Sequence, residues 1–189
     1  TMTSINRTTV VKMHLTLAAF IFPVALMFLV TGGLYTWGIK GSYDSTVHEL
    51  LLTEPLTADS QRLQALVQKK LQQLSVSPPS GNAGIKKGGT SFSLEWTGAD
   101  RDVVLEPTAK PLVAKLTIKD TTWYRNFVQL HKAKGGQLFK VYAAMLAIAL
   151  FGILLSGFIV AWQIPKYRKL AMLATAAGLA MFALMFSAS

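Results

Sequence analysis

Three long apolar runs divide the chain. The first covers Met13–Ile39, and no Asp, Glu, Lys or Arg occurs between Leu15 and Trp37. The other two runs, Val141–Ile164 and Leu170–Ser187, lie in the last third of the sequence. Because a helix needs about 20 apolar residues to cross a bilayer, each run predicts a membrane-spanning helix.

These runs predict six segments along the chain. They are a polar tail (residues 1–13), a first span (14–39), a domain outside the membrane (40–139), a second span (140–164), a short loop (165–169) and a third span (170–189). The insert between the first two spans has the size of a small folded domain.

The insert carries one amphipathic helical pattern after Thr57 or Asp59, either of which can cap a helix. Its apolar residues recur at helical spacing: Leu63, Leu66, Val67, Leu71 and Leu74. Three later segments are predicted as strands: Ser91–Thr97, Asp102–Glu106 and Leu112–Ile118. A second helix is expected over Trp123–His131. The predicted fold class is an α-helical membrane protein with three spans and a small α+β domain built from a helix and a three-stranded antiparallel meander.

Basic residues gather at the ends of the predicted spans. Arg7 and Lys12 precede the first span, and Lys166, Arg168 and Lys169 separate the second from the third. No acidic residue lies near either group. The positive-inside rule puts both groups in the cytoplasm, so the insert and the C-terminus are expected on the opposite side.

This topology accounts for much of the formal charge of +10. Residues 41–139 hold 12 of the 19 basic residues and all 9 acidic residues, so the insert is only mildly basic. We therefore expect no nucleic-acid partner, and we expect the lipid bilayer and another membrane protein as partners. The chain has no cysteine, which excludes disulfides, thiolate nucleophiles and cysteine-bound metals.

Several short motifs occur in a characteristic order. KMHLTLAAF opens the first span, LVTGGLYTW ends it, and LHKAKGGQLFKVYAAMLAIALFGILLSGFIVAW covers the second. VVLEPTAKPLVAKL follows the amphipathic helix as a strand–turn–strand. Together they resemble the PepSY-associated transmembrane family of bacterial inner-membrane proteins. The resemblance implies an inner-membrane location, a cytoplasmic N-terminus and a periplasmic PepSY-like domain.

Better-known members of this family have four or more spans, and some are haem-binding ferric-siderophore reductases. The present chain has three predicted spans, three histidines and no flavin or nicotinamide motif. The resemblance therefore supports the fold more than the reductase activity.

The three histidines are the candidate haem or metal ligands. His14 and His131 are predicted on opposite membrane surfaces, separated by ~30 Å of hydrocarbon, and cannot share one iron. If both spans continue as helices, His48 and His131 each stand ~13 to 15 Å above the same surface. They form either a haem b or metal pair or two surface histidines. No other catalytic or metal-binding motif occurs, so we expect no catalytic residues.

Small residues mark the expected helix-packing positions in the second and third spans. These positions are Gly152, Ser156, Gly157 and Gly178. Small side chains let helix backbones approach closely. They predict either packing among the chain's own helices or docking to a partner membrane protein.

Three functions follow as hypotheses. The first is a non-catalytic accessory or scaffold subunit of a respiratory or other membrane complex. The second, implied by the resemblance, is a haem b electron-transfer protein of the ferric-siderophore reductase type. The third is inhibition of a periplasmic peptidase, a role suggested for some PepSY modules.

Overall fold

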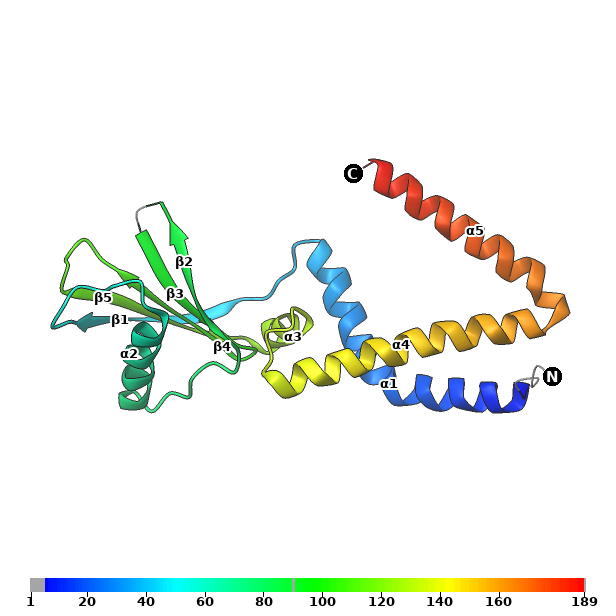
Figure 1. The fold of residues 1–189 in the computed structure, drawn as a ribbon, viewed down its shortest axis with the longest axis horizontal. Helices are drawn as coiled ribbons and strands as arrows, with labels where there is room; N and C mark the ends of the chain where they lie inside the picture. The colour runs from blue at the N-terminus through cyan, green and yellow to red at the C-terminus, as the bar shows by residue number, and fades with distance from the viewer. Residues whose placement is uncertain (1–5, 90, 189) are drawn as a thin grey trace. The chain divides into compact units, whose positions relative to one another are not determined.

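The computed structural model describes residues 6–89 and 91–188, which form five helices and five strands (Figure 1). These residues divide into two compact units. One is the continuous segment Leu26–Ala143. The other combines residues 6–25 with residues 144–188.

Three helices are long and apolar enough to cross a membrane: α1 (Arg7–Thr36), α4 (Gln137–Gln163) and α5 (Pro165–Ala188). The predicted number of such helices is therefore confirmed, whereas their orientation stays a prediction. α1 begins at Arg7, so part of the expected polar tail is helical, and residues 1–5 lie outside the described chain. The expected loop 165–169 is also helical, because Pro165, whose fixed φ suits a first helical position, opens α5 directly.

The unit Leu26–Ala143 contains one antiparallel sheet of five strands. They are β1 (Tyr43–Leu51), β2 (Ala83–Gly88), β3 (Ser91–Thr97), β4 (Arg101–Pro107) and β5 (Val113–Thr121). Their order across the sheet is β1-β5-β4-β3-β2. The predicted meander is present as β3, β4 and β5, but the prediction of a three-stranded sheet is wrong, because a further strand is paired at each side of the meander.

The two strands that the sequence pattern missed are the edges of the sheet. Only Leu50 is buried in β1, and no residue of β2 is buried. An edge strand has a neighbour on one side only, and natural edges often carry charge or glycine. Such strands lack the apolar alternation by which an inner strand is recognised.

The core of this unit lies between the sheet and α2 (Ser60–Gln73). Asp59 is the N-cap of α2, and its carboxylate accepts hydrogen bonds from the backbone N–H groups of Gln61 and Arg62. The buried apolar residues come from the helix and from four strands: Leu50, Leu63, Val67, Leu71, Leu94, Trp96, Val103, Leu105, Ala114, Leu116 and Ile118. The predicted amphipathic helix therefore supplies one side of the core.

The second predicted helix of the domain is α3 (Trp123–His131). It contacts β5 and buries Val128 and Gln129. Gln129 is fully buried although it is polar, and its partners belong to the polar cluster described below. His131 is the last residue of α3.

Candidate functional site

His131 is held against the second half of α1. Its Nδ1 lies 3.0 Å from the hydroxyl of Thr31, and its ring centroid lies 4.9 Å from that of Phe28. Gly32 leaves room for the imidazole, because a Cβ at this position would lie 3.1 Å from Cε1 of His131. Thr31, Gly32 and Phe28 therefore form a cradle for the ring, which we call the His131 cradle.

The Thr31 hydroxyl fixes which nitrogen of His131 carries the proton. Its oxygen also lies 2.7 Å from the carbonyl of Met27, and a carbonyl can only accept a hydrogen bond. Both contacts are satisfied when the hydroxyl donates to Met27 and the Nδ1–H of His131 donates to the hydroxyl. In the neutral ring Nε2 is then the unprotonated nitrogen, and it has no hydrogen-bond partner among the described residues. An imidazole in this form can bind a metal through Nε2.

His14, in the other unit, has the same kind of surroundings. Its Nδ1 lies 2.9 Å from the hydroxyl of Ser156 in α4, and that hydroxyl lies 3.0 Å from the carbonyl of Ile153. A Cβ added to Gly157 would lie 3.5 Å from Cε1 of His14. We call Ser156 and Gly157 the His14 cradle, and by the same reasoning Nε2 is the unprotonated nitrogen in the neutral ring of His14.

Each cradle therefore combines a hydroxyl with the glycine that follows it in sequence. Thr31-Gly32 holds His131, and Ser156-Gly157 holds His14. Each supplies a single imidazole donor. Within residues 6–89 and 91–188, no group of three or more histidine or carboxylate side chains could hold a metal ion. The sequence reasoning named these residues but did not pair each histidine with its hydroxyl.

His48 is part of neither cradle. It is half-buried in β1, where its backbone is paired with Leu116 of β5. The condition for equal height of His48 and His131, that both spans continue as helices, is not met, because α1 ends at Thr36 and the chain continues as a strand. His131 packs beside the last turns of α1. Use of His48 and His131 as one ligand pair stays a prediction.

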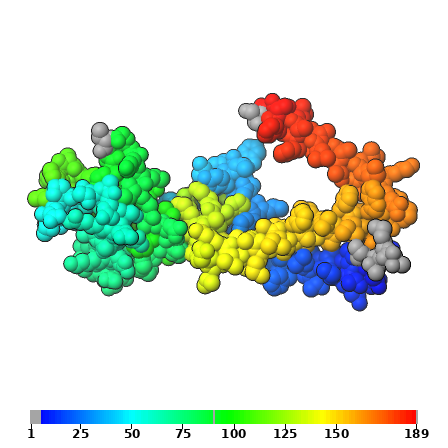
Figure 2. All heavy atoms as spheres, viewed as in Figure 1, coloured from blue at the N-terminus to red at the C-terminus, as the bar shows by residue number. Residues whose placement is uncertain are grey.

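The packing residues predicted in α4 and α5 differ in their surroundings. A Cβ added to Gly152 would lie 3.6 Å from Leu17 of α1, and Ser156 and Gly157 contact His14 as described. A Cβ added to Gly178 would meet no atom within 4 Å beyond its own helix. None of the described residues of α5 is buried (Figure 2, orange to red).

A buried polar cluster joins β1, β4 and α3, and the sequence reasoning did not anticipate it. Its centre is the carboxylate of Asp102, which accepts hydrogen bonds from the Tyr43 hydroxyl at 2.7 Å and from Nε2 of Gln129 at 3.0 Å. The ammonium of Lys134 lies 3.4 Å away, and the backbone N–H of Gly98 also donates to it. These donors stabilise an ionised carboxylate that is only 7% exposed.

Arg125 extends this cluster to the segment that follows α1. Its guanidinium donates to the Tyr43 hydroxyl at 2.8 Å and to the carbonyl of Lys40 at 2.9 Å, and it lies 4.6 Å from the centre of the Tyr43 ring. Tyr124 donates to the carbonyl of Ile39. A Cβ on Gly41 would lie 2.9 Å from the backbone nitrogen of Arg125, and this glycine has a φ of +71°. The segment is thereby fixed to α3.

Burial raises the pKa of Tyr43 above its ordinary value of 10.0, and the hydrogen bond to Asp102 raises it further, whereas Arg125 acts in the opposite direction. Because its pKa is raised, the phenol of Tyr43 stays protonated at neutral pH and can donate to Asp102.

Two buried polar atoms of the cluster, Nε of Arg125 and Oε1 of Gln129, have no hydrogen-bond partner in the described chain.

Comparison with known proteins adds no identification. No family model matches the chain, and no curated protein or solved structure is significantly similar to it. The features that bear on function are therefore the exposed α5, the two histidine cradles and the polar cluster.

Proposed function

We propose that this chain is a non-catalytic accessory or scaffold subunit of a bacterial inner-membrane complex, with a PepSY-like periplasmic domain. The observation that carries the proposal is the exposure of α5. This helix is long and apolar enough to span a membrane, and none of its described residues is buried by the rest of the chain. Its packing partner is then a helix of another protein.

Small residues on α5 support this choice over a helix surrounded only by lipid. Ala171, Ala174 and Gly178 recur at intervals of three and four positions, so they share one face of the helix. Lipid chains fit against any apolar surface, whereas small residues favour close approach of a second helix. The His14 cradle, in contrast, joins α1 to α4 within the chain.

The resemblance in sequence order supports the location and the domain type. The strand–turn–strand of the PepSY-like motif corresponds to β4 and β5, which pair directly. The basic residues Lys166, Arg168 and Lys169 support a cytoplasmic connection between α4 and α5. The domain Tyr43–His131 then lies in the periplasm.

Mild extraction of native membranes tests this proposal. The tagged chain is expected to co-purify with a second membrane protein, and Gly178→Leu is expected to weaken that association by about tenfold or more. Ala176→Leu is the matched control, because Ala176 lies on the opposite face of α5. A chain that is monomeric and alone under every mild extraction condition would refute the proposal.

A second candidate function is electron transfer through haem b, and the two cradles are the observation that favours it. The imidazoles of His131 and His14 would hold the haem through Nε2, the nitrogen not engaged by the hydroxyl. Haem, when bound, supplies one-electron chemistry. Thr31 and Ser156 would orient the rings through Nδ1.

A reduced-minus-oxidised visible spectrum of the purified protein tests this candidate. A haem signal that is lost in His131→Ala or His14→Ala but kept in His48→Ala would support the cradles as ligands. The absence of any haem signal would exclude the candidate. Peptidase inhibition stays a prediction, because no contact among the described residues favours it over the other two functions.

A further inference from the structure

Among residues 6–89 and 91–188, no strand pairs with the outer side of β1. β1 is the first strand in the sheet order, and β5 is its neighbour. At the two ends of β1, the carbonyl of Ser42 accepts a hydrogen bond from the N–H of Thr122, and the N–H of Leu52 donates to the carbonyl of Leu112. Residues with even numbers therefore bond to β5, and those with odd numbers direct their N–H and C=O groups to the free side. Ser45, Val47 and Glu49 present these unpaired groups.

The two edges of the sheet are not equally protected. β2 is short, contains Gly84 and Gly88, and carries Lys86 and Lys87 side by side. Glycine, lysine and short length discourage the addition of another strand. β1 has nine residues with no lysine, proline or glycine, and Val47 is 55% exposed. The β1 edge is therefore the one that can accept a strand.

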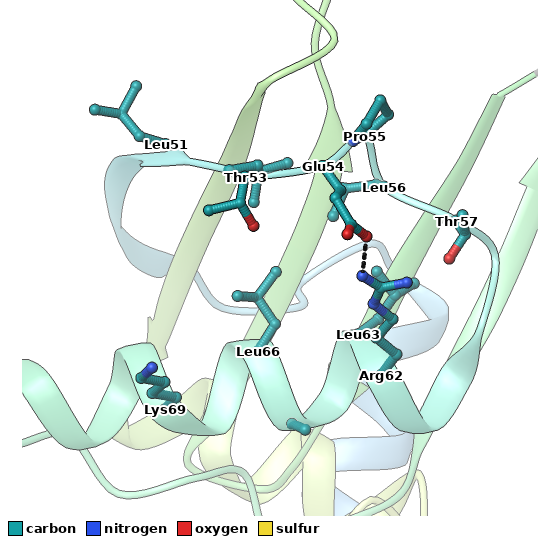
Figure 3. A pocket seen from close by; sticks show the side chains of 12 residues that line it. Leu51, Thr53, Glu54, Pro55, Leu56, Thr57, Arg62, Leu63, Leu66 and Lys69 are labelled. Carbon is teal, nitrogen blue, oxygen red and sulfur yellow. Dashed lines mark hydrogen bonds and ion pairs between the residues drawn. The ribbon is translucent and has the colours of Figure 1, made fainter.

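A groove lies where β1 meets α2. A hollow of about 460 Å³ lies between α2 and the segment that follows β1, with Leu51, Leu56 and Leu66 in its wall (Figure 3). A second hollow of about 390 Å³ lies against Glu49, Leu50 and Lys70. Both are lined by Leu51, Leu66 and Lys69, so the two form one continuous groove beside the free edge.

The charges of the groove favour an acidic ligand. Arg62 is paired with Glu54 across the groove (Figure 3). Lys69 and Lys70 follow on the same helix and have no carboxylate partner among the described residues. Glu49 is the one carboxylate on this wall that is also unpaired. The two free lysines therefore fit acidic side chains on the face of an added strand that is turned to α2.

We propose that the β1 edge and this groove bind an extended segment of a partner protein that alternates apolar and acidic residues. The segment adds as a sixth strand, with backbone hydrogen bonds to Ser45, Val47 and Glu49. Its acidic side chains face α2 and pair with Lys69 or Lys70, and its apolar side chains lie on the other face of the sheet beside the exposed Val47. This inference deepens the accessory function proposed above and rests on it.

Binding of a short fluorescent peptide of alternating valine and glutamate to the full chain tests this proposal. The protein is placed in phosphatidylcholine nanodiscs, which carry no net charge. The peptide is expected to bind, whereas one of alternating valine and lysine is expected to bind at least about tenfold more weakly. Charge reversal in Lys69→Glu/Lys70→Glu is expected to remove this preference.

Val47→Pro tests strand addition itself. It removes an N–H that faces the free side, so the ladder between β1 and β5 stays intact, and binding is expected to fall by about tenfold or more. Val47→Thr is the matched control and is expected to bind normally. As a second measurement, a peptide N-methylated at alternate residues is expected to lose binding to the unaltered protein.

Unchanged binding of the N-methylated peptide, or equal binding of both peptide charges, would overturn the proposal. A dimer of the chain that forms through β1 and excludes the peptide would also overturn it. If the peptides fail to bind while Gly178→Leu still releases the native partner, this surface is wrong and the accessory function stands. If the native partner is absent but the peptides bind, the accessory function is wrong.

Discussion

The imidazole of His131 and the hydroxyl of Thr31 are 100 positions apart in sequence and 3.0 Å apart in the structure. Thr31 is 3% exposed, so its hydroxyl cannot readily exchange this contact for water. The contact joins the end of α3 to α1, and in the neutral ring it leaves Nε2 of His131 as the unprotonated nitrogen that can bind a ligand. It therefore serves packing and candidate ligand geometry at once.

Thr31→Val should destabilise the unit Leu26–Ala143 by about 1 kcal/mol, because Nδ1 of His131 loses its acceptor. Thermal unfolding followed by circular dichroism measures this loss. Thr36→Val is the control, since its hydroxyl bonds only to the carbonyl of Gly33 within the same helix. Equal effects of both substitutions would contradict the role assigned to Thr31.

Gly32→Ala should be more damaging than Gly33→Ala. A Cβ at position 32 would press on Cε1 of His131 at 3.1 Å, whereas a Cβ at position 33 meets nothing within 4 Å. Overpacking of this kind costs about 1–3 kcal/mol, while alanine in place of an exposed helical glycine is favourable by up to about 1 kcal/mol. Unfolding midpoints of the two variants should therefore move in opposite directions.

Ionisation of Tyr43 should destabilise the domain at high pH. Its raised pKa means that the folded state holds the phenol proton more tightly than the unfolded state does. The resulting stability is present below pH 10 and is lost as the pH rises through the folded pKa. Asp102→Asn should lower the pKa of Tyr43, because it removes the negative acceptor.

The ultraviolet absorbance of tyrosinate measures this titration, and the difference from Tyr43→Phe isolates the residue from the four other tyrosines. Tyr43→Phe should also remove the part of the alkaline destabilisation that Tyr43 causes. A Tyr43 pKa that is unchanged by Asp102→Asn would show that the hydrogen bond between them is not formed.

Asp59→Ala should weaken α2 by about 1 kcal/mol. Its carboxylate accepts from the N–H of Gln61 at 3.0 Å and of Arg62 at 3.3 Å. Thr57→Ala is the control, because Thr57 was the alternative cap in the sequence pattern and Asp59 is the observed one. Chemical denaturation measures the loss of unfolding free energy in both variants. A larger loss in Thr57→Ala than in Asp59→Ala would contradict the assignment of Asp59 as the cap.

Apolar patterning predicted the inner strands β3, β4 and β5, the bounds of the helix α3 and the three long apolar helices. The apolar pattern did not predict β1 and β2, because edge strands need little apolar surface. No sequence periodicity points to Asp102 and Gln129 as partners, since their contact depends on how β4 and α3 meet.

The histidine sites were predictable only in part. His14, Thr31 and Gly32 stood out as residues of the family resemblance, but nothing in their spacing joins Thr31 to His131. The expected height of His48 assumed that a helix continues beyond the membrane, and this assumption does not hold, because α1 ends at Thr36. Tertiary contacts over long sequence distances decide these positions.

The pairing of β1 with β5 also determines when the sheet can form during synthesis. Tyr43 pairs with Thr121, 78 positions later in the chain, and β5 is its neighbour in the sheet. At roughly 5–20 residues per second, a nascent chain takes about 4 to 16 s to supply that partner. During this interval both edges of β1 are unpaired. The strand therefore leaves the ribosome several seconds before β5 is available to pair with it.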